Sequence, residues 1–303
     1  MISPLIAAFP EARIIASIGT VIFAALTAMV IASAWARINK TTLTGPWCWS
    51  LLSLGAIAAV EGLVAGGLVR QSAEAWRFAA SVGIFSPWMS LIGAKRPQDQ
   101  PWHFIVASLW GIQALPAAEA LFLRPGQPLA IIDFRAFFLM VLICLSLLIH
   151  LPTRFWWTAL LAAGGQLLLL WSYLPFDTTP PTAFHVVGAA VLFLAAALVA
   201  LLNVRRPRAA LPFDRLWQDF RDAFGALWAV RVMERVNASA AMYDWPVRLT
   251  WSGFRAAEDL SRVAEIPPAI APDVQRVLVN LLRRFVSHGW IEQRLHQPTS
   301  PSI

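Results

Sequence analysis

Ionisable side chains inside long runs of apolar residues are the part of this sequence most able to do chemistry. Glu61 lies in such a run, and inside a bilayer its carboxylate must pair with a cation, take up a proton or face water. Further ionisable residues fall in other apolar runs, toward the same side of the predicted bundle: Arg77, Glu119, Asp133, Arg135 and His185. These six residues predict a charged vestibule that serves as a ligand site or an ion pathway. Alternatively, those near the ends of their runs reach water along their own side chains and have no further role.

Two histidines suggest a different chemistry at the opposite side. His103 begins one apolar run and His150 ends the next, which places two imidazoles at a similar depth on consecutive antiparallel helices. Such a pair can ligate haem b, the one cofactor that the sequence suggests. Both positions lie at the predicted bilayer surface, however, where a porphyrin would stay uncovered. Histidines without a cofactor are therefore the alternative interpretation.

Other catalytic and metal-binding signatures are missing from the sequence. Cys48 and Cys144 stand far apart, and no Cys or His spacing predicts a metal cluster or a disulfide framework. We find no P-loop, GxGxxG, kinase, protease or HExxH pattern. We therefore assign no catalytic residue and no metal ligand, and we favour a non-enzymatic protein.

The composition predicts that helices crossing a membrane must position these residues. Hydrophobic residues make up 58% of the 303 residues and charged residues only 14%, whereas soluble domains carry roughly 25% charge. Seven stretches are long enough to cross an apolar layer about 30 Å thick as helices. They cover residues 14–36, 45–69, 74–94, 101–123, 128–150, 154–174 and 182–204. We predict an all-α polytopic bundle in residues 1–204, embedded in the lipid bilayer.

Basic residues in the connections predict how the bundle is oriented. They follow the first, third, fifth and seventh stretches, as Arg37, Lys95, Arg154 and Arg205 illustrate. Because basic loops resist translocation, these connections belong in the cytoplasm, with the N-terminus outside and the C-terminus inside. The strong preference for Arg over Lys, 22 against 2, fits a high-GC bacterial genome. For a bacterial chain with this topology, we expect the inner membrane as the location.

A pair of small residues predicts close helix packing. Gly62 and Gly66 form a GxxxG pattern in the second stretch, and such a pattern lets a neighbouring helix approach closely. We expect this neighbour to belong to the same bundle.

Residues 205–303 read as a small, mainly helical cytoplasmic domain. Helices are predicted from Asp214 to about Asn237, over residues 254–264 and over residues 273–287, with an extended piece at residues 245–251. A disordered tail is predicted from about residue 297.

A role in DNA binding is not predicted for this domain. Residues 281–292 resemble a winged-helix recognition helix that runs into its wing. From Pro212 onward, however, the sequence contains eleven arginines and ten acidic residues. The near-zero net charge predicts no basic surface for a phosphate backbone. We expect no nucleic-acid partner and instead expect a protein partner at this domain.

Three functions remain open from the sequence. The first is a non-enzymatic transporter-like bundle or an accessory subunit of a membrane complex, with the cytoplasmic domain as its interaction module. The second is a sensor that perceives a ligand at the outer vestibule and signals through the cytoplasmic helices. The third is a membrane enzyme carrying haem, which depends only on His103 and His150.

Overall fold

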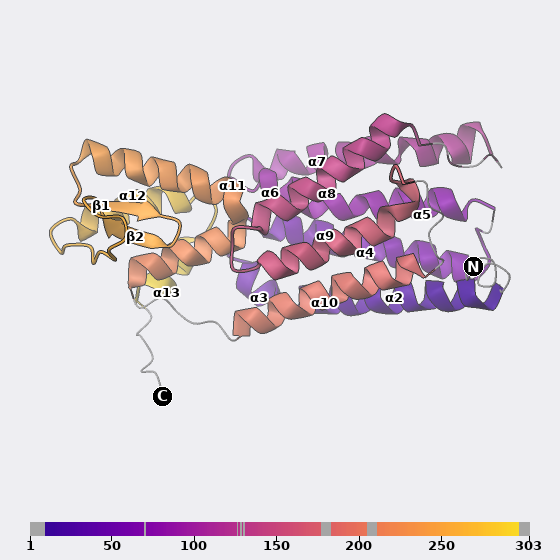
Figure 1. Ribbon diagram of the computed structural model, residues 1–303, viewed down its shortest axis with the longest axis horizontal. Coiled ribbons are helices and arrows are strands. Elements are labelled where there is room, and N and C mark those ends of the chain that lie inside the picture. Colours follow the sequence, from indigo (N-terminus) through magenta and orange to yellow (C-terminus); the bar gives the residue numbers. More distant parts are fainter. Residues whose placement is uncertain are drawn as a thin grey trace.

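The computed structural model describes residues 10–69, 71–125, 127, 129, 131–176, 183–204 and 211–296. A bundle of long helices and a smaller C-terminal domain lie one after the other along the longest axis of the molecule (Figure 1). We call the end of the bundle that meets the C-terminal domain the near end, and the opposite end the far end. The predicted tail from residue 297, Arg205 and the first residue of the seventh stretch lie outside the described residues.

The bundle consists of helices with breaks at a few identifiable positions. Its elements are α2 (Pro10–Ala32), α3 (Trp35–Ile38), α4 (Thr44–Ala65), α5 (Ala73–Ser81), η1 (Val82–Phe85), α6 (Ser86–Ile92), α7 (Asp99–Ala118), η2 (Glu119–Leu123), α8 (Asp133–His150), α9 (Trp156–Leu170), η3 (Trp171–Tyr173) and α10 (Phe184–Val204). The third predicted stretch is broken at η1, just before Pro87 opens α6, because proline suits the first turn of a helix and disrupts an interior. Pro116 likewise precedes the wider π-helical turn of η2.

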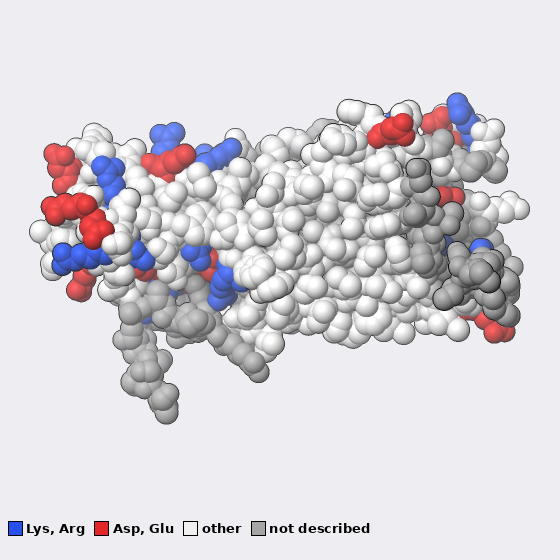
Figure 2. Space-filling model, viewed as in Figure 1, with Lys and Arg blue, Asp and Glu red and all other residues white. Residues whose placement is uncertain are grey.

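Five of these helical segments are long enough and apolar enough to cross a membrane, counted over the described residues. They are Glu11–Ala32, Thr44–Ala65, Asp99–Leu123, Asp133–His150 and Phe184–Asn203. On the face drawn in Figure 2, charged side chains gather over the C-terminal domain and at the far end, and a broad uncharged surface separates them. This distribution is compatible with a membrane location.

Glycines allow two bundle helices to approach closely, although not the glycines that the sequence suggested. A Cβ on Gly62 would meet nothing within 4 Å, and one on Gly66 would meet only its own helix and Leu68. The described residues therefore place no neighbouring helix against the GxxxG pattern. The close approach instead joins α9 to α10, where a Cβ on Gly165 would lie 3.1 Å from the carbonyl oxygen of Gly188.

The C-terminal domain combines three helices with a hairpin. Its elements are α11 (Pro212–Met242), β1 (Val247–Thr250), β2 (Gly253–Ala256), α12 (Ala271–Leu282) and α13 (His288–His296). β1 and β2 are antiparallel, with Val247 opposite Ala256. The prediction of a helix over residues 254–264 was therefore wrong, whereas the extended piece before it is confirmed. The resemblance of residues 281–292 to a recognition helix and its wing is not confirmed either, because residues 288–296 form the helix α13.

An aromatic core holds this domain together and continues into the bundle. Trp217, Phe220 and Phe224 of α11 are fully buried against residues of α12 and of the hairpin. The same cluster includes Leu91 and Ile149, which belong to bundle helices. Burial of aromatic side chains is a large source of stability, so the domain and the bundle share part of one hydrophobic core.

Backbone hydrogen bonds fasten the domain to connections at the near end. The Thr42 N–H donates to the Phe285 carbonyl at 2.8 Å, the Arg96 N–H to the Arg284 carbonyl at 2.9 Å, and the Ser287 N–H to the Lys40 carbonyl at 2.8 Å. The Trp251 indole also donates to the Pro152 carbonyl, at 2.7 Å. The connections after α3, α6 and α8 therefore all lie at the near end.

Candidate functional site

Glu61 and Arg77 form a buried ion pair toward the far end. The Nε and Nη2 atoms of Arg77 each donate to one carboxylate oxygen of Glu61, both at 2.8 Å. Arg77 Nη2 also donates to Ser17 Oγ at 3.1 Å, and His185 interacts electrostatically with Glu61. Glu61 is only 2% exposed. Its charge is thus neutralised in a two-point geometry that links α4 to α5.

The other predicted vestibule residues do not join this ion pair. Glu119 pairs with Arg124 at 3.4 Å, and both side chains are largely exposed. Asp133 is exposed and Arg135 is partly exposed, and neither forms an ion pair within the described part of the chain. The structure therefore brings together Glu61, Arg77 and His185 of the six predicted residues.

The two predicted haem ligands have different partners. His103 Nδ1 accepts a hydrogen bond from the Trp49 indole at 2.9 Å. His150 packs edge to face on Trp88, with the ring centroids 5.3 Å apart. Within the described residues, no group of three or more His, Cys, Asp or Glu side chains could hold a metal ion. The haem interpretation stays a prediction that these contacts do not favour.

A cavity of about 490 Å³ lies at the near end, between the bundle and the C-terminal domain. Its walls inside the bundle come mainly from α2, α4, α9 and α10, and they are lined largely by apolar or small residues. Among these residues are Val30, Leu54, Ala159, Leu192, Ala196 and Val199. Known small-molecule sites have volumes of roughly 300 to 1,000 Å³ and similar apolar walls. The cavity therefore has the size and character of a ligand site.

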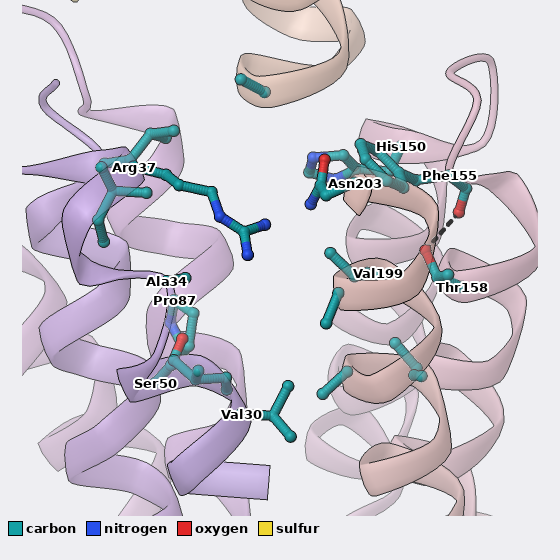
Figure 3. A pocket seen from close by; sticks show the side chains of 18 of the residues that line it. Val30, Ala34, Arg37, Ser50, Pro87, His150, Phe155, Thr158, Val199 and Asn203 are labelled. Carbon is teal, nitrogen blue, oxygen red and sulfur yellow. Dashed lines mark hydrogen bonds between the residues drawn. The ribbon is translucent and has the colours of Figure 1, made fainter. Parts of the chain in front are cut away.

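The cavity lies between the near-end parts of α2 and α10. Toward the far end the two helices touch, because Gly19 leaves room for Val186 and the rings of Phe23 and Phe193 lie 6.1 Å apart. Toward the near end, side chains of α2 and α10 line opposite walls of the cavity, as Val30 and Val199 do in Figure 3.

Charged residues line the cavity where it meets the C-terminal domain. Arg294 Nε of α13 contacts Asp219 Oδ2 of α11 at 2.6 Å. Arg154 Nε contacts Asp222 Oδ2 at 3.3 Å. Arg37 also lines the cavity, so this rim contains three arginines and two aspartates. The apolar chamber thus ends in a set of charged groups, most of which are already paired.

Burial and an aromatic ring position Arg294 in this rim. Its guanidinium lies over the Trp290 ring, 3.5 Å from the centroid. Burial lowers the pKa of Arg294 to about 10, because the charged form loses solvation. The side chain still carries its proton at neutral pH, and it can pair with Asp219.

Comparison with known protein families, curated proteins and solved structures gives no match. Sequence reasoning did not find the cavity, because its lining residues are scattered from Thr27 to Arg294. One available signal was the concentration of arginines in connections that follow apolar runs. That pattern was used to orient the bundle and not to locate a site.

Proposed function

We propose that this chain is a multi-pass protein of the bacterial inner membrane that binds an amphiphilic small molecule in the near-end cavity. It would act as a transporter-like bundle or as an accessory subunit of a membrane complex. The observation that carries the proposal is the cavity itself, whose apolar walls end in a charged rim. An amphiphile satisfies both parts, since its apolar chain would cover the walls and its polar group would reach the rim.

The proposed topology has seven spans, with the N-terminus outside and the C-terminal domain in the cytoplasm. Five spans correspond to the long apolar helices. The broken segment of α5, η1 and α6 and the shorter α9 would supply the other two. Support for the orientation comes from Arg37, Lys95 and Arg154, which occupy near-end connections, because basic loops stay in the cytoplasm.

Reporter fusions test the topology. We expect green fluorescent protein to fluoresce when fused after near-end residues and alkaline phosphatase to be active when fused after far-end residues. Suitable near-end positions are Lys40, Lys95 and Pro152, and suitable far-end positions are Ser72, Arg124 and Phe176. Reporters that place Ser72 and Lys95 on the same side would remove the span formed by α5 and α6. Active phosphatase after Lys40 would reverse the orientation.

Obstruction of the cavity tests ligand binding. Val199 lines the cavity, whereas Leu201 on the same helix is 44% exposed and is not part of the lining. We expect Val199→Trp to abolish specific binding of radiolabelled hexadecanol and palmitate to the detergent-solubilised protein, and Leu201→Trp to leave it intact. Excess unlabelled ligand defines specific binding, and thermal unfolding checks that both variants fold. Equal binding by the two variants would overturn the proposal.

The alternative of a sensor is supported by the composition of the cavity rim. Asp219, Asp222 and Arg294 belong to the C-terminal domain, so a ligand in the cavity would contact the part for which we propose a protein partner. In this version, ligand should change hydrogen exchange in α13 but not in α12, which contributes no lining residue. Unchanged exchange in α13 would count against signalling. Co-purification from native membranes tests whether the domain has a protein partner.

A further inference from the structure

We infer that the amphiphile is an acid, and that Arg37 and Asn203 bind the oxygens of its carboxylate or phosphate headgroup. This inference rests on the proposed function, because it concerns the same cavity. It adds the chemical class of the headgroup and the side chains that recognise it.

Arg37 is the charged residue of the rim that has no partner in the described structure. In Figure 3 its guanidinium extends into the cavity from the wall formed by α2 and α3. The other four charged residues pair as Arg294 with Asp219 and Arg154 with Asp222. The Arg37 N–H donates to the Ala34 carbonyl at 2.9 Å, but among the described residues none forms a hydrogen bond or an ion pair with the Arg37 side chain. Its donors are therefore available to a ligand.

Asn203 supplies an amide on the opposite wall. Arg154 Nη2 donates to Asn203 Oδ1 at 2.6 Å, so Oδ1 is the acceptor of this amide and Nδ2 is the donor. The described residues offer no acceptor to Nδ2. Figure 3 places Arg37 and Asn203 on facing walls of the cavity, so a headgroup between them would meet donors from both sides.

The charges at the rim favour an anion over a neutral or cationic headgroup. Three arginines and two aspartates line the cavity, which leaves one positive charge in excess. Asp222 is shared further, because Arg221 Nη2 also contacts it at 2.8 Å. A cationic headgroup would face Arg37 directly, and a neutral one could accept a hydrogen bond from the exposed guanidinium but would not neutralise its charge. Carboxylates and phosphates match the fork of guanidinium donors, which can bind two oxygens at once.

A comparison of ligands with the same chain and different headgroups tests the inference. The probes are radiolabelled palmitate, hexadecyl phosphate and hexadecanol, bound to the detergent-solubilised full-length protein. The variant Arg37→Gln keeps much of the side-chain length and removes the charge. Lys40→Gln is the matched control, because Lys40 lies in the adjacent connection, is exposed and does not line the cavity.

We expect the wild type to bind both acids more tightly than the alcohol, and Arg37→Gln to weaken both acids by about tenfold to a hundredfold. The alcohol should bind Arg37→Gln and the wild type equally, and Lys40→Gln should behave as the wild type. Asn203→Asp adds a negative charge beside the headgroup and should also weaken the acids selectively. If Arg37→Gln weakens the binding of palmitate alone, or of hexadecyl phosphate alone, the site recognises only that headgroup. This result would overturn the inference that the site recognises both.

Other outcomes separate this inference from the proposed function. If acids and alcohol bind equally to the wild type and Arg37→Gln changes neither, the acidic headgroup is refuted while the cavity remains a binding site. If Lys40→Gln weakens the acids as much as Arg37→Gln, the effect is a general surface charge and the inference fails. If Val199→Trp leaves all three probes bound, the ligand is not in the cavity and both proposals fail.

Discussion

The indole Nε1 of Trp228 donates a hydrogen bond to the carbonyl oxygen of Leu91, 2.9 Å away and 137 residues earlier in the chain. The bond links α11 of the C-terminal domain to the last turn of α6. Both residues belong to the hydrophobic core that the domain shares with the bundle. Removal of this bond therefore tests whether the C-terminal domain and the bundle stabilise each other.

Replacement of Trp228 by Phe should weaken the attachment of the C-terminal domain. Phenylalanine keeps much of the apolar contact but removes the indole hydrogen bond. The Leu91 carbonyl still accepts from the Ala94 N–H at 3.2 Å, so the loss should be about 0.5 to 1.5 kcal/mol. Thermal unfolding of the purified protein should show a lower midpoint. Trp157→Phe is the control, because Trp157 is 58% exposed. An equal change in both variants would mean that the bond contributes nothing specific.

Gly225 should not tolerate a side chain. Its φ of 73° lies in the left-handed region, at the kink within α11. A Cβ there would lie 2.6 Å from Ile149 Cγ2 and 2.7 Å from the Ile149 carbonyl oxygen. We expect Gly225→Ala to lower the unfolding midpoint markedly, since backbone strain alone costs about 1 to 3 kcal/mol. Gly289→Ala should be harmless, because nothing lies within 4 Å of its position; similar midpoints for the two variants would refute the tight packing.

The ion pair between Glu61 and Arg77 should behave as a unit. Glu61→Gln leaves the Arg77 charge without its partner, a change that costs up to about 3 to 5 kcal/mol for fully buried pairs and less here, because the Arg77 side chain is 23% exposed. The double variant with Arg77→Gln should lose less stability than the two single variants added together. Additive losses would show that the two side chains do not interact.

An exposed ion pair supplies the control for that comparison. Glu119 and Arg124 are 47% and 62% exposed, so Glu119→Gln should change the free energy of unfolding by less than about 1 kcal/mol. Both measurements use the same detergent and the same thermal ramp. A large effect at Glu119 would contradict its assignment to an exposed pair.

Asp214 should give the C-terminal domain a pH-dependent stability. Its Oδ1 accepts a hydrogen bond from the Phe254 N–H at 2.7 Å. Burial nevertheless raises the pKa of Asp214 above its ordinary value of 3.8. Because the folded state holds this proton more tightly than the unfolded chain, the stabilising contribution is full below the unfolded pKa. It is lost as the pH rises through the folded pKa.

Asparagine at position 214 keeps an acceptor and cannot ionise. The unfolding midpoint of Asp214→Asn should therefore rise relative to the wild type as the pH increases from acid to neutral. At Asp259 the stability should change with pH in the opposite direction, because hydrogen bonds from Ser261 lower the pKa of its carboxyl. Asp259→Asn should lose stability relative to the wild type over the same range. A midpoint difference for Asp214→Asn that does not vary with pH would refute the prediction.

Helix formation in the bundle was largely predictable from the sequence, because long apolar runs leave few alternatives to helix. Pairing was one of the three states expected for Glu61, since an isolated buried carboxylate is costly. The identity of its partner, Arg77, was not predicted, because it depends on how α5 packs on α4. The broken helix before Pro87 shows how local backbone chemistry divides a stretch that hydropathy alone treats as continuous.

The hairpin and the cavity could not be predicted from the sequence, for a different reason. Residues 254–264 have a composition that suits a helix, but pairing of Phe254 with Leu249 places the start of this segment in a sheet. The cavity is lined by residues of α2 and α10 and by Arg294, which comes from α13. Neither feature leaves a periodic pattern in the sequence, because each arises from contacts between segments far apart in the chain.

The backbone hydrogen bonds from residues 284–287 to the near-end connections also have a consequence for biogenesis. Lys40, Thr42 and Arg96 are synthesised long before their partners Ser287, Phe285 and Arg284. During translation these groups must therefore stay hydrated or find temporary partners until residues 284–287 have left the ribosome. The near end can be completed only after that point, so a chain that terminates before residue 284 presents an open near end to the quality-control proteases of the cell.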